Sequence, residues 1–188
     1  MPILNIDNYR VKRENANNVD LNRNFETGWG TFNDVNRGPA PLSEPETQAI
    51  HNTLITVQPT WFIDYHTGDT RISPPWGYIA TPTPDAAYLR SIYDKYALLC
   101  QQAGISPLRW SLSTPYGGGL ARDEGYHHGA YSYAVELAVS TPVYSVVKDT
   151  LAPNVRWLLQ AVSLESLKKY TFKQWQDGDT NPSKTVTV

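Results

Sequence analysis

The pattern of apolar and polar residues predicts helices and strands that follow one another closely along the chain. Apolar residues recur at helical spacing within residues 43–57, within residues 85–103 and in a last stretch that starts near Pro153. Residues 61–66 form a short aromatic run bounded by turn residues, and residues 130–139 alternate as a strand does. A helix that leads directly into a strand indicates an α/β fold.

The first predicted helix has a clear start signal. Ser43 is the expected N-cap, Pro45 suits the first turn, and Glu46 stands three residues after the cap. Gln58 precedes Pro59, and this pair is expected to end the helix just before the aromatic strand.

Long loops separate the predicted elements. Residues 1–42 are mostly polar, and residues 67–84 are rich in Gly, Pro and Thr. Loops of this length without regular structure are often functional. The end of the chain, from about residue 171, is polar and is expected to fray. We therefore expect one domain over residues 1–170 and a polar tail over residues 171–188.

Composition and charge narrow the class of protein. The chain has 188 residues and a formal net charge of −2, which suits one globular domain and gives no argument for binding nucleic acid or a membrane surface. No apolar run approaches the length of a membrane span, and Met1 leads into polar residues rather than a signal peptide. The single Cys100 falls within a predicted helix, which favours a buried thiol.

A polar segment between Arg13 and Phe25 offers the first candidate chemistry. It contains two arginines, Arg13 and Arg23, and several asparagines that include Asn22. The planar guanidinium fork of arginine matches the two oxygens of a carboxylate, and a neighbouring amide adds a neutral donor and acceptor. The alternative is a polar loop whose Asn and Asp side chains bond the local backbone.

Two further residues stand out at the ends of the predicted strands. His66 ends the aromatic strand, where open α/β sheets place their ligands, although a lone histidine is more often structural than a metal ligand. Glu136 shares a face with small residues near the end of an apolar strand, where a carboxylate is costly unless it is paired or used in chemistry. The alternative for Glu136 is a salt-bridged residue at a strand end.

The other histidines are weaker candidates for metal ligands. His51 is expected in mid-helix, exposed, with no carboxylate or histidine placed to form a metal pair with it. His127 and His128 are adjacent, and adjacent side chains on an extended chain point apart.

The segment RENANNVDLNRNF, residues 13–25, resembles the substrate-carboxylate segment of the zinc metallocarboxypeptidases. In that family an Asn-Arg pair binds the C-terminal carboxylate of a peptide, and an upstream arginine polarises the scissile carbonyl. The resemblance implies these roles for Asn22, Arg23 and Arg13, with Arg10 as a competing candidate of poorer spacing. It covers nearly all of the chain and implies a mixed, mostly parallel sheet flanked by helices on both faces.

Two more segments resemble the family in the same order. Residues 64–68, DYHTG, resemble the segment of the third zinc ligand, which implies that His66 binds zinc through an imidazole nitrogen. Residues 133–137, YAVEL, resemble the strand that bears the general base, which implies that Glu136 deprotonates the attacking water and later protonates the leaving amine.

The resemblance also extends to the residues that surround the peptide C-terminus. Tyr116 matches the mobile tyrosine that closes over it, and the glycines at 117–119 would allow such movement; the alternative is an ordinary exposed turn tyrosine. Arg122 falls where the family selects the C-terminal side chain, so the resemblance implies a preference for an acidic one by charge complementarity.

The zinc motif of the family is incomplete in this chain. The family binds zinc through His-x-x-Glu and a later histidine, whereas none of the four histidines here is followed three residues later by Glu. Twelve residues precede Arg13, so the resemblance implies a missing upstream segment. A sheet without its first strands would expose an edge beside residues 61–66, and we expect a complementary N-terminal segment or a second copy to pair there.

The residues and the resemblance together predict a zinc-dependent metallocarboxypeptidase that acts on peptide C-termini, with no nucleic-acid or membrane partner. Three alternatives stay open: a peptidase that trims peptidoglycan stem peptides, a zinc-deficient relative that binds C-termini without cleaving them, and a structural fragment. The family resemblance implies an extracellular or periplasmic location, although no signal peptide is seen.

Overall fold

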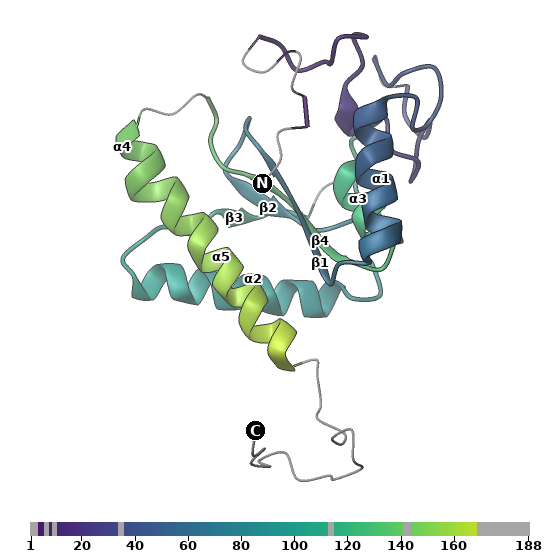
Figure 1. Ribbon diagram of the computed structural model, residues 1–188. Coiled ribbons are helices and arrows are strands. Elements are labelled where there is room, and N and C mark those ends of the chain that lie inside the picture. The colour runs from purple at the N-terminus through teal and green to yellow at the C-terminus, as the bar shows by residue number, and fades with distance from the viewer. Residues whose placement is uncertain are drawn as a thin grey trace, which may run out of the picture.

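The computed structural model (Figure 1) describes most of the chain. The described residues are 4, 5, 8, 11–33, 36–112, 115–140 and 144–168. The predicted tail at residues 171–188 and the competing candidate Arg10 lie outside them.

The described residues form helices and short strands in alternation. The helices are α1 (Pro45–Val57), α2 (Ala86–Gln102), α3 (Ala121–His127), α4 (Tyr144–Val146) and α5 (Ala152–Lys168), with a 3-10 turn η1 (Leu21–Arg23) and a π-helical segment η2 (Val147–Leu151). The strands are β1 (Trp61–His66), β2 (Arg71–Ser73), β3 (Arg109–Trp110) and β4 (Tyr131–Glu136). None of the described helices is long and apolar enough to cross a membrane.

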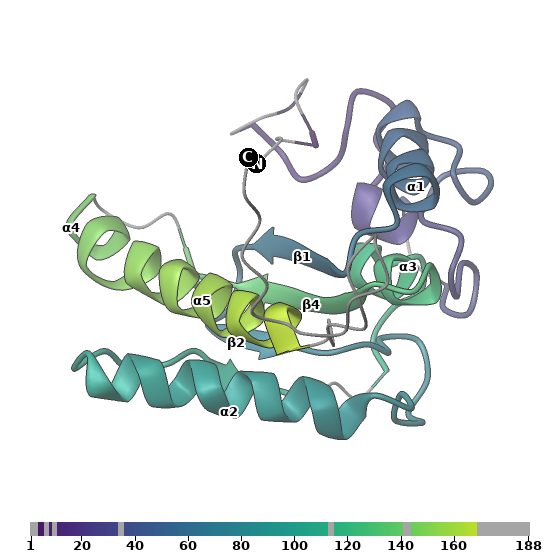
Figure 2. The same ribbon diagram turned by 60° about the horizontal axis from the view of Figure 1, so that its bottom comes forward.

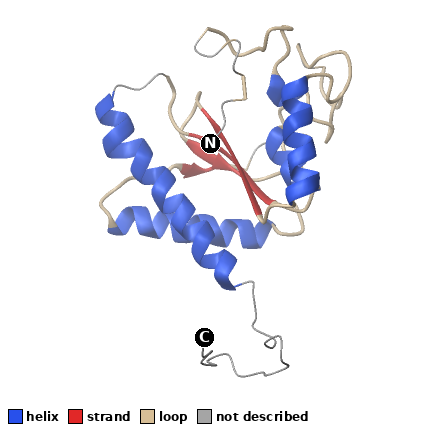
Figure 3. Ribbon diagram, in the orientation of Figure 1, coloured by secondary structure: helices blue, strands red, loops and turns tan. Residues whose placement is uncertain are grey.

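The strands form one open, mixed sheet (Figure 3), in which their order is β1-β4-β2-β3. Strand β1 pairs with β4 in parallel, β2 pairs with β3 in parallel, and β2 pairs with β4 in antiparallel. The predicted mixed, mostly parallel α/β sheet is therefore confirmed. Strand β1 lies at one edge of the sheet, which is where the sequence predicts an exposed edge.

Alternation along β1 and β4 separates the two faces of the sheet. Helices α2 and α5 cover one face of the sheet (Figure 2), and Ile63 and Tyr133 belong to the apolar cluster formed with them. On the other face Phe62 packs so closely under α3 that a Cβ added at Gly125 would lie 2.7 Å from its ring. Because side chains alternate with period two, His66 and Glu136 share the face of Phe62. The strand predicted over residues 130–139 is found but is shorter, at Tyr131–Glu136.

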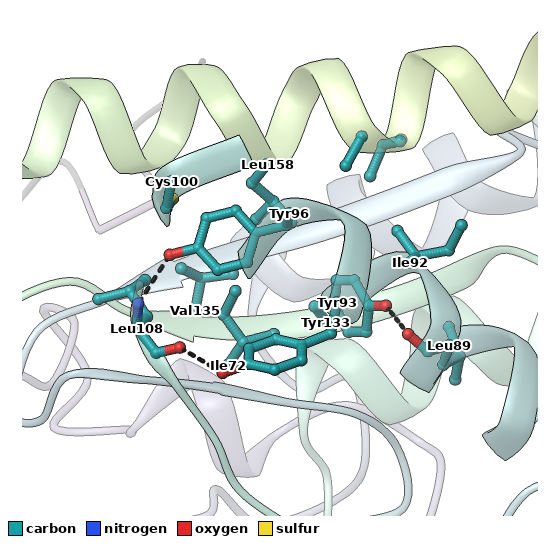
Figure 4. Packing of buried hydrophobic residues seen from close by; sticks show 12 residues of the cluster. Ile72, Leu89, Ile92, Tyr93, Tyr96, Cys100, Leu108, Tyr133, Val135 and Leu158 are labelled. Atoms are coloured by element: carbon teal, nitrogen blue, oxygen red, sulfur yellow. Dashed lines mark hydrogen bonds between the residues drawn. The ribbon is translucent and has the colours of Figure 1, made fainter. Parts of the chain in front are cut away.

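The core between α2, α5 and the sheet contains three buried tyrosines, Tyr93, Tyr96 and Tyr133, whose hydroxyls all form hydrogen bonds (Figure 4). The Tyr93 hydroxyl donates to the backbone oxygen of Leu108 at 2.9 Å, and the Tyr96 hydroxyl accepts from the Leu108 nitrogen at 2.8 Å. Burial raises the pKa of both tyrosines, so these hydroxyls stay protonated at neutral pH. Cys100 is buried among them, as predicted.

The structure corrects several predicted boundaries. Helix α1 begins at Pro45 with Glu44 as its N-cap, and the Ser43 hydroxyl donates to the Glu44 carboxylate at 2.7 Å instead of capping the helix. The loop predicted over residues 67–84 contains β2. The last helix, α5, begins at Ala152 as predicted, and α4 and η2 precede it directly in the chain. Helix α3 has no counterpart among the predicted elements.

Candidate functional site

The polar segment before α1 meets the carboxyl end of β1 through Asn22. The Asn22 amide nitrogen lies 3.2 Å from Nε2 of His66, and its amide oxygen accepts a bond from the Ala121 nitrogen at 2.8 Å. Asp20 fixes the backbone here by accepting from the Asn22 nitrogen at 3.1 Å. Asn22 thus links the end of β1 to the start of α3.

Asp20 also holds the two arginines of the segment. Nε of Arg13 donates to Oδ2 of Asp20 at 2.7 Å, and Nη1 of Arg23 lies 4.0 Å from the same oxygen. Nη1 of Arg23 also donates to the backbone oxygen of Asn22 at 2.7 Å. The side chain of Arg13 remains half exposed, with 52% of its surface accessible. Asp20 bonds the local backbone, as the polar-loop alternative expects. This does not prevent Arg13 and Arg23 from binding a ligand.

His66 is oriented by a carboxylate two residues before it. Its Nε2 lies 2.5 Å from Oδ2 of Asp64, and no described residue forms a hydrogen bond with its Nδ1. Burial lowers the pKa of His66, but the charges of Asp64 and Glu136 and the bond to Asp64 outweigh it, so the pKa is raised. A carboxylate on one imidazole nitrogen is the usual support of a histidine that binds metal through the other.

Glu136 lies directly beside His66 on the neighbouring strand. The parallel register pairs His66 with Glu136, and the antiparallel register pairs Glu136 with Arg71. One carboxylate oxygen, Oε2, is buried without a hydrogen bond to any described residue. Burial raises the pKa of Glu136, partly offset by the charges of His66, Arg71 and Arg13. A desolvated carboxylate of raised pKa is suited to accept a proton near neutral pH.

Tyr116 lies over a group of three guanidinium groups. The guanidinium carbons of Arg122, Arg23 and Arg71 are 5.3, 5.8 and 5.9 Å from the centre of its ring. The tyrosine is 37% exposed, and its backbone nitrogen donates to the Gly77 oxygen at 2.9 Å. Such a concentration of positive charge beside an exposed ring favours an anionic ligand.

Sequence reasoning missed Arg71. It falls in the stretch predicted to be a loop, and only the three-residue strand β2 brings it level with Glu136. Its Nη1 lies 3.5 Å from Oδ2 of Asp69, and its Nε is buried without a hydrogen bond to a described residue. No sequence motif marks it, because its place depends on the pairing of β2 with β4.

Arg122 lies in α3 and is 1% exposed. Its Nε is 3.3 Å from Oδ1 of Asp123, whose other oxygen accepts from the Gly77 nitrogen at 2.8 Å. A Cβ at Gly77 would come within 2.5 Å of the Arg122 guanidinium, so the glycine is required for this packing. Asp123 therefore neutralises part of the positive charge of Arg122. The predicted preference for acidic C-terminal side chains depends on that charge.

A cavity of about 220 Å³ opens beside Asn22 and His66, and its lining does not include Arg23, Tyr116, Arg122 or Glu136. Its lining includes Arg13, Asn22, Asp64 and His66. A larger cavity of about 560 Å³, between the end of β4 and the helical run at residues 146–154, touches none of the predicted site residues.

The donor set around His66 fits one ligand of a zinc site and not a whole one. Among the described residues, the one group of three His, Cys, Asp or Glu side chains that could share an ion is His51, Glu124 and His128. His66 is not part of it.

The prediction for His51 is wrong, and so is the extended chain predicted at His127 and His128, although the two are not grouped as metal ligands. Nδ1 of His51 lies 2.6 Å from Oε1 of Glu124, and Nε2 of His128 lies 3.3 Å from the same oxygen. His51 is partly buried, and His128 is the C-cap of α3 rather than part of an extended chain. The packing of α1 on α3, which local periodicity cannot show, brings the three side chains together.

Comparisons with known proteins agree on one family. The family model described as zinc carboxypeptidase matches residues 4–155. Carboxypeptidase SOL1 of Arabidopsis thaliana is 37% identical over 159 residues, which cover 79% of this chain and 27% of that protein. Murein peptide amidase A of Escherichia coli K12 is 39% identical over 69 residues, which cover 29% of this chain and 28% of that protein.

Solved structures show the same fold. Bovine thrombin-activatable fibrinolysis inhibitor, in complex with tick carboxypeptidase inhibitor, superposes with a TM-score of 0.76 at 21% identity, covering 90% of this chain and 69% of that one. Carboxypeptidase A of Helicoverpa armigera gives 0.72 at 20% identity, covering 89% and 51%. The chain thus spans little more than a quarter of the curated relatives named above.

Proposed function

The chain belongs to the zinc carboxypeptidase family, and on that premise we propose that it binds the C-terminal carboxylate of a peptide and supplies the general base of a metallocarboxypeptidase. The observation that carries the proposal is the meeting of Asn22, His66 and Glu136 at the carboxyl ends of β1 and β4. This is the edge of an α/β sheet at which ligands bind.

The peptide carboxylate would be held by Arg23, the amide of Asn22 and the Tyr116 hydroxyl. Arg23 and Tyr116 lie close together, with 5.8 Å between the guanidinium carbon and the ring centre. Arg71 adds a second cation to this group, 5.9 Å from the same ring. A guanidinium bound to a carboxylate in fork geometry supplies both charge and orientation.

The scissile carbonyl would face Arg13 and Glu136. Arg13 is half exposed and held by Asp20, so it can donate to a developing oxyanion; a donor in that role contributes about a hundred- to a thousandfold in rate. Glu136 would take a proton from the attacking water and return it to the leaving amine. Its raised pKa brings the acid and base forms closer together in energy near neutral pH.

Zinc is the cofactor of the family, and it would polarise the carbonyl and acidify the attacking water. His66 would provide one ligand through Nδ1, with Asp64 fixing the ring. Among the described residues, no group of three side chains that could share a metal ion includes His66. Hydrolysis would then require a complementary N-terminal segment or a second copy, and the open edge at β1 is the place for such a partner to pair.

The test is product analysis by mass spectrometry with the zinc-loaded chain. A peptide with a free C-terminus should lose its last residue, and the same peptide with a C-terminal amide should not. Arg23→Gln should abolish the difference, whereas Arg90→Gln, a change to an exposed arginine of α2, should preserve it. Cleavage of both peptides at the same rate would exclude an exopeptidase that reads the carboxylate. Binding without cleavage would instead support a C-terminus-binding relative.

Sedimentation tests the proposed partner. At micromolar concentration the isolated chain should dimerise or pair with a complementary segment, and a stable monomer that cleaves peptides would rule that partner out.

A second candidate substrate is the stem peptide of peptidoglycan. The observation that favours it is the 39% identity to a murein peptide amidase over 69 residues. Stem peptides also present carboxylates, so the same arginines would hold them. Faster cleavage of soluble muropeptides than of ordinary peptides would support this candidate, and the reverse order would support a general carboxypeptidase.

Side-chain preference is proposed from Arg122. Parallel assays of peptides that end in Glu, Phe and Lys should favour Glu if the guanidinium reaches the side chain. No preference for Glu would end that part of the proposal.

A further inference from the structure

Helices α1 and α3 meet at three metal-binding side chains outside the site described above. His51 comes from α1, and Glu124 and His128 come from α3 and its C-cap. One donor atom from each lies within 4.8 Å of the other two. None of the three lines the cavity around His66.

The carboxylate at the centre of this group is fully buried and held in one orientation. Oε2 of Glu124 accepts from both the backbone nitrogen and the hydroxyl of Thr27, at 2.9 and 2.6 Å. Its other oxygen, Oε1, therefore faces the two imidazoles. Burial raises the pKa of Glu124, but the bonds from Thr27 and His51 and the charge of His128 outweigh it and lower the pKa. Glu124 is a carboxylate at neutral pH.

The distances between the three donor atoms would suit a transition-metal ion after a small movement of the His51 side chain. Two ligands at about 2.0–2.2 Å from a tetrahedral ion lie about 3.4 Å apart. Nε2 of His128 is already 3.3 Å from Oε1, whereas Nδ1 of His51, at 2.6 Å, must move outward. Both histidine side chains are partly exposed, at 15% and 21%, so they can adjust and leave one side open to solvent.

The two imidazoles are also arranged as separate ligands. Their ring centres are 4.9 Å apart and their planes are inclined by 82°. Two imidazoles and a carboxylate that converge on one point form a donor set that binds Zn²⁺ and its neighbours in the first transition row.

We propose that His51, Glu124 and His128 form a zinc-binding site that joins α1 to α3. The ion would have two imidazole nitrogens and one carboxylate oxygen as protein ligands, with water in the remaining position. Since the Ala121 nitrogen at the start of α3 holds Asn22, an ion at the other end of this helix would stiffen the support of the carboxylate-binding residues. The proposed site stands whether or not the chain hydrolyses peptides.

The experiment is a zinc titration of the full chain against a competing chelator, carried out in a His66→Gln background so that the other histidine site is removed. One zinc ion should still bind. Thr27 supports the ligand Glu124, and Thr27→Val should weaken zinc binding by about 10- to 100-fold, as is usual for such a supporting contact. His51→Gln and His128→Gln each remove a ligand, and each should weaken zinc binding by more than about a hundredfold.

His127→Gln is the matched control, since His127 is adjacent to His128 but is not a member of the group. It should leave the affinity unchanged. Zinc should also raise the midpoint of thermal unfolding of the control and not that of His128→Gln.

Replacing zinc by Co²⁺ gives a readout that needs no variant, because coordination by two imidazoles and a carboxylate changes the visible absorption of the ion. Absence of bound zinc in the His66→Gln chain, an unchanged Co²⁺ spectrum, or equal affinities in His128→Gln and His127→Gln would each overturn the proposal.

Discussion

The amide nitrogen of Asn22 lies 3.2 Å from Nε2 of His66, although the two residues are 44 positions apart in the chain. The same amide binds the start of α3 through its oxygen. The segment that resembles a carboxylate-binding loop and the strand that resembles a zinc-ligand strand are thus parts of one site.

Asn22→Asp tests the role of this amide. The carboxylate keeps an acceptor for the Ala121 nitrogen, so the fold should be preserved, but its charge should repel a peptide carboxylate. We expect affinity for peptides with a free C-terminus to fall about tenfold or more, which corresponds to about 1.4 kcal/mol. Calorimetric titration measures the change, and amidated peptides serve as the control because their weak binding should not change.

Glu136→Gln separates proton transfer from binding. Where hydrolysis is measurable, its rate should fall by about 10²- to 10⁴-fold, whereas peptide affinity should be retained. Because the pKa of Glu136 is raised by burial, the folded state is favoured at low pH, and that stabilisation is lost as pH rises through the folded pKa. Urea unfolding across this range should show that loss in the native chain and not in Glu136→Gln. An unchanged rate would remove Glu136 from the mechanism.

Arg71→Gln tests the residue that sequence reasoning missed. The charge of Arg71 lowers the pKa of Glu136, so its removal should raise that pKa further and shift the pH profile of activity to higher pH. It should also weaken binding of the peptide carboxylate. Carboxyl NMR signals report the pKa directly. If Arg71→Gln changes neither the pKa nor the affinity, Arg71 only pairs with Asp69.

The buried carboxylate of Glu44 is expected to make the free energy of unfolding fall at acid pH. Glu44 is 3% exposed, and its carboxylate accepts bonds from the Asn15 and Asn17 amides, each at 2.7 Å. Burial raises its pKa, but these bonds and one from Ser43 outweigh it, so the pKa is lowered. The stabilisation is present above the unfolded pKa of about 4.3 and is lost as pH falls through the folded value.

Glu44→Gln should therefore be less stable than the native chain near neutral pH and should lose less stability on acidification. Exposed Glu26→Gln is the control and should follow the native curve. Parallel curves for the native chain and Glu44→Gln would contradict this assignment.

The sequence predicted the parts of the fold that have long, regular patterns. Residues 61–66 were recognisable as a short aromatic run bounded by turn residues, and the strand that contains Glu136 was recognisable because its side chains alternate. Strands β2 and β3 have three and two residues, too few for any periodicity, so Arg71 could not be placed beside Glu136. Helix α3 was missed because its buried residues include Arg122, Asp123 and Glu124, which a search for apolar faces does not identify as buried.

Local sequence patterns also cannot show which residues far apart in the sequence are in contact. His51 and Glu124 are 73 residues apart, and only the packing of α1 on α3 makes them partners. The roles of Asn22, Arg23, Tyr116 and His66 came from the resemblance rather than from periodicity, and they remain predictions that mutation can test.

The central claim is that Arg23 and its neighbours bind a peptide through its C-terminal carboxylate. A thermodynamic cycle tests it most directly: affinities of one peptide as the free acid and as the amide, measured with the native chain and with Arg23→Gln. We predict that the native chain prefers the acid by about tenfold or more, and that Arg23→Gln loses most of this preference. An equal preference in both chains would contradict the claim.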